Sequence, residues 1–236
     1  MLAATVVAAD AQTFTVLHTF TGGGGEGANP YAGLILDKAG NLYGTTLNGG
    51  LWQHGTVFKL DTTGVLTTLH SFERRGDGNK PYGGVVQDPS GNLFGMTPTG
   101  IGTKFARGIV YRIGTNGKEA KPHVFAGPPS DGENPLAGLI RDPSGNLYGT
   151  TGGGGSGCDT GGQGGCGIVF KVSKGNETVL YNFTGSSTGD GAHPEGTLVR
   201  DKAGNLYGTT LQGGNPSAPF GTVFKLDTTG REIVLH

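Results

Sequence analysis

The sequence has little charge and no long apolar run. Charged residues make up 15% of its 236 residues, and 17 basic against 18 acidic side chains leave a net charge of −1. Binding to a nucleic-acid backbone depends on many Lys and Arg side chains that neutralise phosphates, so this balance argues against a nucleic-acid partner. No segment approaches the roughly 20 apolar residues of a membrane-spanning helix, so we expect no transmembrane segment.

Cysteine is also scarce. Cys158 and Cys166 are the only two, and they lie in the glycine-rich segment GCDTGGQGGCG. Two thiolates with no histidine nearby are too few ligands for a zinc site. A pair that closes a short loop is typical of a disulfide formed in an oxidising compartment, with free thiols as the alternative. We predict this disulfide.

The first residues, MLAATVVAADAQ, are small and largely apolar. Ala9, Asp10 and Ala11 match the pattern that precedes a signal-peptidase cut, although a charged region ahead of them is missing. We interpret residues 1–12 as the remnant of a secretory signal peptide or as a disordered start. The protein is then secreted, with residues 13–236 as a single domain.

Glycine, in contrast, is abundant, and it marks a repeat. The 49 glycines and 12 prolines make up about a quarter of the chain and recur at fixed offsets between apolar runs, which indicates turns. GTVFKLDTTG occurs twice, at residues 55–64 and 221–230. Alignment on it gives four repeats at approximately residues 21–72, 73–125, 126–183 and 184–236. A period of this length points to a propeller or a solenoid.

Each repeat contains four short segments with the composition of β-strands. In the first repeat they are AGLILD, NLYGTT, TVFKL and VLTTLHSF. They are rich in β-branched and aromatic residues, and tight turns built on Asp, Pro, Gly and Asn join the first to the second and the third to the fourth. We predict an all-β fold, a β-propeller of four repeats with four antiparallel strands each.

Residues 13–20 resemble a fifth copy of the fourth strand. In closed propellers, a strand from one terminus commonly completes the blade that the other terminus begins. The four repeats then form either a closed four-blade ring or an arc of a larger propeller. Because an open arc leaves sheet faces and edges uncovered, we expect the closed ring if the chain folds alone.

The motif AGNLYGTT, a glycine-rich gap, GTVFKLDTTG and then LHSF resemble the GloVer tandem repeat of bacterial secreted and surface-anchored proteins. The resemblance covers about residues 13–236, and the motif recurs four times. It implies a secreted, propeller-like array whose members carry varied C-terminal anchors. It transfers no catalytic residue to this chain.

An acidic residue followed by glycine lies shortly before a proline in every repeat. We call these residues the acidic rim: Glu26, Asp77, Asp131 and Asp190. A propeller would place them as a ring on the face that carries the long loops, where they could hold Ca²⁺ or bind sugar hydroxyls. The alternative, favoured by the recurrence in every repeat, is that Asp-Gly builds the turn between blades. No other cofactor is expected.

Residues that break the repeat are better candidates for a unique binding site, because variable loops on a rigid scaffold carry specificity. Trp52 lies beside His54 in such a loop, an arrangement suited to stacking on a sugar, although the favoured alternative for Trp52 itself is that it covers a blade edge. Arg107 and Phe220 hold the equivalent place in repeats two and four, and His193 lies in the fourth acidic connection.

Nucleophilic catalysis finds little support, since there is no G-x-S-x-G motif. His18, His70 and His236 share one position of the repeat and are interpreted as packing residues. Our leading hypothesis is a β-propeller that binds a glycan or another surface polymer without turnover. A polysaccharide hydrolase or lyase that uses two acidic-rim carboxylates is the alternative, and a purely structural spacer is the third possibility.

Overall fold

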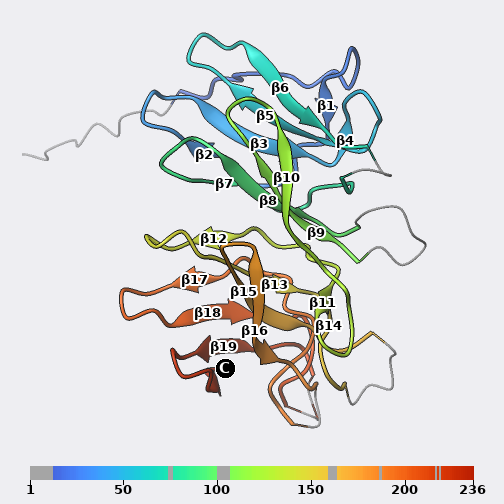
Figure 1. The fold of residues 1–236 in the computed structure, drawn as a ribbon, viewed down its shortest axis with the longest axis vertical. Helices are drawn as coiled ribbons and strands as arrows, with labels where there is room; N and C mark the ends of the chain where they lie inside the picture. The colour runs from blue at the N-terminus through green and yellow to red at the C-terminus, as the bar shows by residue number, and fades with distance from the viewer. Residues whose placement is uncertain are drawn as a thin grey trace, which may run out of the picture.

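In the computed structural model, the described residues are 13–73, 77–99, 107–158, 164–185, 188–215, 217 and 219–236. They form four antiparallel sheets of four strands, one for each repeat, arranged one after another along the long axis of the molecule (Figure 1). No helix occurs among them. The prediction of an all-β fold with four strands per repeat is therefore confirmed.

We call the four sheets blades 1 to 4. Blade 1 consists of β2 (Ile35–Leu36), β3 (Leu42–Thr46), β5 (Thr56–Leu60) and β6 (Leu66–Ser71). Blade 2 consists of β7 (Val86–Gln87), β8 (Leu93–Thr97), β9 (Ile109–Ile113) and β10 (Glu119–Val124). Blade 3 consists of β12 (Ile140–Arg141), β13 (Leu147–Thr151), β15 (Ile168–Ser173) and β16 (Asn176–Asn182). Blade 4 consists of β17 (Val199–Arg200), β18 (Leu206–Thr209), β19 (Val223–Leu226) and β20 (Glu232–Val234).

Two short ladders supplement the blades. The strand β1 (Gly27–Ala28) pairs with β4 (Asn48–Gly49), and β11 (Gly132–Glu133) pairs with β14 (Gly153–Gly154). Each ladder ties the connection that enters a blade to the loop between that blade's second and third strands. Both sets of long loops therefore meet on one face, as the alternating strand directions predict.

The tight turns are held by the aspartate that precedes them. In blade 1, Asp37 accepts hydrogen bonds from the backbone N–H groups of Ala39 and Asn41, from the Asn41 side chain and from the Tyr43 hydroxyl. The Asn41 side chain contributes most to lowering the pKa of Asp37, to about 2. The same bonds from the asparagine side chain recur at three other aspartates: Asp88, Asp142 and Asp201.

The glycine in the middle of each second strand makes room for an aromatic ring. A Cβ atom on Gly149 would lie 2.7 Å from the ring of Phe170, and one on Gly208 would lie 2.6 Å from the ring of Phe224. These aromatic side chains come from the neighbouring third strand and cross directly over the glycine. The sequence L-[YF]-G is therefore a packing requirement of the blade.

Three hydrophobic clusters hold the blades together, one at each interface between successive blades. At each interface, an aromatic residue that follows one blade's fourth strand packs edge-to-face on the third strand of the next blade. The ring centroids are 5.1–5.2 Å apart in the pairs Phe72–Tyr111, Phe125–Phe170 and Phe183–Phe224. Such aromatic pairs add about 0.5–1.5 kcal/mol beyond the burial of their area.

The described blades form an open arc. Blades 1 and 4 lie at opposite ends of the molecule (Figure 1), and no hydrophobic cluster of the described residues joins them. Val223 of blade 4 is 39% exposed, whereas its counterparts Val57, Val110 and Val169 are fully buried against the next blade. The same packing recurs at each interface, so each blade stacks on the one before it and blade 4 leaves its own packing face uncovered. The closed four-blade ring is not observed.

Residues 13–20 do not form the expected strand. A fourth strand needs the free edge of a third strand, and all four third strands already pair with β6, β10, β16 or β20. The Phe20 ring instead packs edge-to-face on Phe58 at 5.1 Å, which is the place that Phe72, Phe125 and Phe183 take at the later interfaces. Phe20 thus covers part of blade 1, whereas residues 13–17 are exposed.

Candidate functional site

We call the connections that enter blades 1 to 4 the first to fourth junctions. At each junction the acidic-rim residue contacts a ring side chain from the segment just before it. The pairs are Glu26 with His18, Asp77 with His70, Asp131 with His123 and Asp190 with Tyr181. No cluster able to ligate a metal within the described part of the chain contains two acidic-rim residues. The structure therefore places the four acids at four separate junctions.

The aspartates of the acidic rim are buried and organise their turns. Asp131 accepts hydrogen bonds from the backbone N–H groups of Ala126 and Gly132, at 2.7 and 2.6 Å. Burial by itself would raise the pKa of Asp131, but interactions with His123, Ala126 and Gly132 together outweigh it, and the pKa lies below its ordinary value. This supports the turn-building interpretation of Asp-Gly.

Three glutamates that sequence reasoning missed lie at the start of the fourth strands: Glu119, Glu177 and Glu232. Each has one carboxylate oxygen, Oε1, that is buried and has no hydrogen-bond partner. Burial, and then the charge of the nearby Asp131, raises the pKa of Glu177 to about 7. The signal in the sequence was a recurring glutamate in repeats two to four, at the position that Leu66 fills in repeat one.

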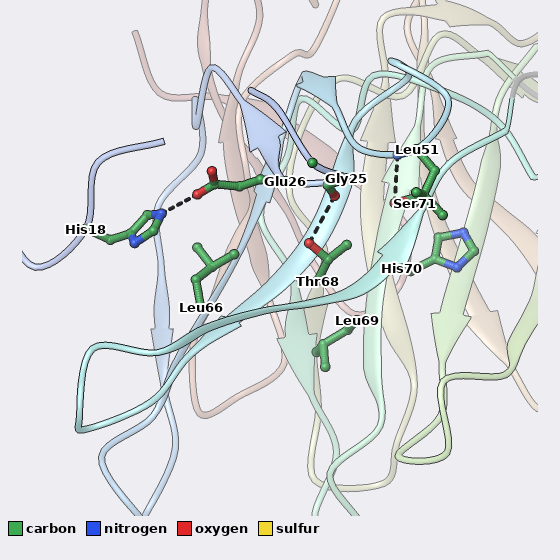
Figure 2. A pocket seen from close by; sticks show the side chains of 10 residues that line it. His18, Gly25, Glu26, Leu51, Leu66, Thr68, Leu69, His70 and Ser71 are labelled. Carbon is green, nitrogen blue, oxygen red and sulfur yellow. Dashed lines mark hydrogen bonds and ion pairs between the residues drawn. The ribbon is translucent and has the colours of Figure 1, made fainter. Parts of the chain in front are cut away.

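The first junction opens into a cavity of about 700 Å³, which we call the outer pocket (Figure 2). It is lined by His18, Gly24, Gly25, Glu26, Leu51, Leu66, Thr68, Leu69, His70 and Ser71. Its polar groups largely bond to one another. The Thr68 hydroxyl donates to the carbonyl of Gly25, and the Ser71 hydroxyl accepts from the N–H of Leu51. Few of these groups are left free to bind a ligand.

A second cavity of about 520 Å³, the inner pocket, is built by all four repeats. It is lined by Tyr31, Asn79, Lys80, Tyr82, Pro98, Thr99, Asn134, Leu136 and Glu195. The Tyr31 and Tyr82 rings meet edge-to-face with their centroids 5.9 Å apart, and Tyr31 is 73% exposed. The inner pocket therefore combines exposed aromatic surface with an amine, amides and a carboxylate.

The inner pocket lies where the chain enters each first strand, and the backbones of successive repeats approach each other closely there. A Cβ atom on Gly84 would lie 2.9 Å from the carbonyl oxygen of Gly33. The backbone N–H of Gly138 donates to the hydroxyl of Thr197 at 2.9 Å. Close approach of the backbones explains why small residues occur two and three positions after each proline.

The residue before each anchoring proline has a positive φ: 59° at Asn29, 52° at Lys80, 58° at Asn134 and 55° at His193. This conformation is uncommon for residues other than glycine, and it often marks functional sites. Lys80 and Asn134 line the inner pocket. The residues on either side of the proline differ between repeats, as N-Y, K-Y, N-L and H-E, and this was the signal that sequence reasoning overlooked.

The predicted repeat-breaking residues lie apart from one another. Trp52 is 55% exposed and follows Leu51, which lines the outer pocket, while the backbone carbonyl of His54 accepts a bond from the N–H of Lys80. Arg107 forms an ion pair with Glu133. Neither pocket's lining includes Trp52, His54 or Arg107.

The remaining two repeat-breaking residues lie in the fourth repeat, outside the strands of blade 4. Phe220 is 88% exposed, and its backbone forms an isolated bridge with Gly213. His193 contacts the carbonyl of Gly152 through Nδ1. Of all the predicted site residues, only Glu26 lines either of the two pockets. The predicted disulfide between Cys158 and Cys166 is present.

Solved structures of propeller-like proteins are similar to this chain. The match to a gluconolactonase from Xanthomonas campestris has 15% identity and a TM-score of 0.50, and it covers 86% of this chain and 60% of that protein. The match to TolB from Acinetobacter baumannii has 15% identity and a TM-score of 0.49, and it covers 83% of this chain and 40% of that protein. The match to a calcium-binding regucalcin from Agrobacterium tumefaciens has 16% identity and a TM-score of 0.44, and it covers 87% of this chain and 74% of that protein. The chain spans about 60% of the gluconolactonase, and the likeness to it shows the fold alone.

No curated protein matches the sequence. Among the described residues there is also no helix long and apolar enough to cross a membrane. The family model of the Gloeobacter/Verrucomicrobia repeat matches residues 4–160 and 106–236, which together span nearly the whole chain. The structure shows these repeats as successive four-stranded blades. The chain therefore belongs to the Gloeobacter/Verrucomicrobia repeat family.

Proposed function

We propose that this protein is a secreted or cell-surface module that binds a glycan, or another hydroxyl-rich surface polymer, in the inner pocket. The observation that carries the proposal is the pair of tyrosine rings, Tyr31 and Tyr82, beside polar groups contributed by three repeats. This location replaces the loop around Trp52 as the candidate binding site, because the polar groups converge at the inner pocket.

The chemistry of the inner pocket suits a sugar. The apolar face of a pyranose ring can stack on an exposed tyrosine, and its hydroxyls can bond to polar groups around the ring. Lys80 and Asn134 supply donors, and Asn134 and Glu195 supply acceptors. The backbone conformation at Lys80 and Asn134 fixes the positions of their Cβ atoms before a ligand binds. This reduces the conformational entropy that these residues lose on binding.

Two observations support a location outside the cell. The disulfide between Cys158 and Cys166 is the kind of cross-link that persists in oxidising compartments. The start of the chain also has the composition of a signal-peptide tail. Both are compatible with a protein that meets polymers at the cell surface.

The test is a glycan-array screen of the purified chain, followed by affinity measurements on Tyr31→Ala and Tyr82→Ala. An aromatic stacking contact contributes about 0.5–1.5 kcal/mol to the binding free energy beyond the burial of its surface area. We therefore expect each variant to bind roughly tenfold more weakly. Trp52→Ala and Phe220→Ala are matched controls, because they remove exposed rings outside the inner pocket. If no ligand is found, or if only the control variants lose affinity, the proposal is wrong.

The same proteins test the other functions inferred from the sequence. A polysaccharide-active enzyme would release product from a polysaccharide panel, and the release would disappear in Asp77→Asn or Asp131→Asn. Calcium at the acidic rim would make binding depend on Ca²⁺ and sensitive to a chelator. A purely structural spacer would show neither binding nor turnover.

A further inference from the structure

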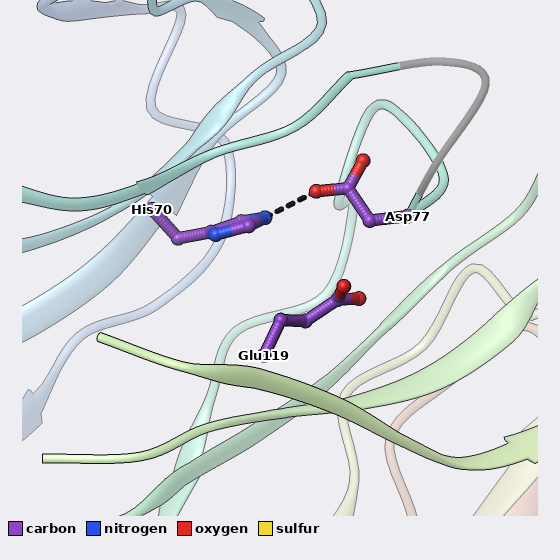
Figure 3. Close-up of side chains that lie close together, drawn as sticks. All are labelled: His70, Asp77 and Glu119. Atoms are coloured by element: carbon purple, nitrogen blue, oxygen red, sulfur yellow. Dashed lines mark hydrogen bonds and ion pairs between the residues drawn. The ribbon is translucent and has the colours of Figure 1, made fainter. Parts of the chain in front are cut away.

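The second and third junctions each bring together an imidazole and two carboxylates. At the second junction, His70, Asp77 and Glu119 each offer one ligand atom, and these atoms all lie within 4.8 Å of one another (Figure 3). Figure 3 shows the carboxylate of Glu119 lying beneath the contact between His70 and Asp77. His70 lies in the last strand of one blade, Asp77 lies in the connection, and Glu119 begins the outermost strand of the next blade.

The third junction repeats this arrangement with His123, Asp131 and Glu177, again within 4.8 Å of one another. The Nε2 atom of His123 lies 3.1 Å from Asp131. Ionising both carboxylates of this junction places a charge of −2 in a half-buried position, which is costly unless a cation lies beside them. A bound dication would neutralise this charge.

A second observation concerns the glutamate of each cluster. The Oε1 atoms of Glu119 and Glu177 are buried and have no hydrogen-bond partner, although buried polar atoms are nearly always bonded. Each glutamate belongs to the cluster of its own junction. A glutamate with a buried, unpartnered oxygen, whose carboxylate has an atom within 4.8 Å of an imidazole nitrogen and a second carboxylate oxygen, is suited to a metal ion.

We propose that the second and third junctions are binding sites for a divalent transition-metal ion, each formed by one His, one Asp and one Glu. The ion links the end of one blade to the outer strand of the next, and three protein ligands leave a position for water. Zn²⁺ is the probe of choice, since imidazole favours transition metals whereas Ca²⁺ prefers six to eight oxygen ligands. Bonds of about 2 Å require the three ligand atoms to close in by about 1 Å.

The two sites differ in one neighbouring charge. At the second junction, Lys121 binds the other carboxylate oxygen of Glu119 at 2.6 Å. No described cation forms such an ion pair with Glu177. Because Lys121 already neutralises part of the charge at the second junction, we expect the third junction to bind Zn²⁺ more tightly.

The other two junctions supply matched controls. At the fourth junction, Tyr181 takes the place of the histidine next to Asp190, while Glu232 is retained. At the first junction, His18 and Glu26 are present, but Leu66 takes the place of the glutamate. Each lacks one of the three ligands, so the part of the chain that the structure describes carries two complete clusters and two incomplete ones.

The experiment is isothermal titration of Zn²⁺ into the tag-free, chelator-treated full chain. We expect two bound ions, one in Glu177→Gln, one in Glu119→Gln and none in the double variant, with each substitution weakening its own site at least tenfold. Glu232→Gln must leave both ions in place, and Leu66→Glu should add a third. Circular dichroism of each variant confirms that it is folded.

Several outcomes would overturn the proposal: no binding below 100 µM Zn²⁺, unchanged binding in the double variant, or a lost ion in Glu232→Gln. Tighter binding of Ca²⁺ than of Zn²⁺ would refute the assignment to a transition metal. A rise in the melting temperature with Zn²⁺ that disappears in the double variant would show the link between blades, since a ligand that binds only the folded state stabilises it. Glycan binding in the inner pocket is a separate measurement and does not depend on this result.

Discussion

The valine in the middle of each third strand provides a direct test of the open arc. Val169 of blade 3 is fully buried in the cluster shared with blade 4, whereas Val223 of blade 4 is 39% exposed. The two residues occupy the same position of the repeat and the same kind of strand. Substitution of each by alanine therefore compares one packing environment with and without a following blade.

The magnitudes follow from burial. Valine to alanine removes two methyl groups, worth about 1.6 kcal/mol at roughly 0.8 kcal/mol each. In Val169→Ala the cavity left between two blades adds to this, for a total of about 2–3 kcal/mol. Val223→Ala leaves no enclosed cavity and removes groups that are already partly in water, so we expect about 1 kcal/mol or less.

The assay is urea denaturation followed by circular dichroism, with the free energy of unfolding obtained at constant m-value. Val199→Ala, at a position 67% exposed on blade 4, is the control and should change stability by less than about 0.5 kcal/mol. Equal costs for Val169→Ala and Val223→Ala would refute the open arc. If a second molecule covers blade 4, the effect of Val223→Ala on stability will depend on protein concentration, whereas closure of a ring gives no such dependence.

Three further predictions concern single features of the blades. Replacing both Cys158 and Cys166 by serine opens a loop with a sequence separation of 8 and should lower the free energy of unfolding by about 2–3 kcal/mol, an effect that a reductant reproduces in the native protein. Gly149→Ala places a Cβ 2.7 Å from Phe170 and should destabilise by about 1–3 kcal/mol; an unchanged denaturation midpoint would show that the ring moves freely. Burial raises the pKa of Glu232 to about 7, so its contribution to stability is complete below pH 4.5 and is lost as the pH rises through 7. The loss of stability between pH 5 and 8 should therefore be smaller in Glu232→Gln, and an identical pH profile would contradict the raised pKa.

The sequence by itself determined the local structure of each blade. Strands and tight turns depend on neighbours within a few residues, such as the aspartate and asparagine around each turn, so recurrence of AGNLYGTT and GTVFKLDTTG was enough to predict four blades of four strands. The disulfide was predictable for the same reason, because its cysteines close a short loop.

Only the tertiary structure decided what the blades form together. Residues 13–20 have the composition of a strand, yet they do not form one, because no third strand among the blades has a free edge to pair with. Closure likewise depends on how successive blades pack, and this left Val223 exposed and the arc open. The inner pocket and the junction clusters join residues from different repeats. A repeat pattern records which positions are alike, whereas a site depends on which unlike residues the packing of blades brings within a few ångströms.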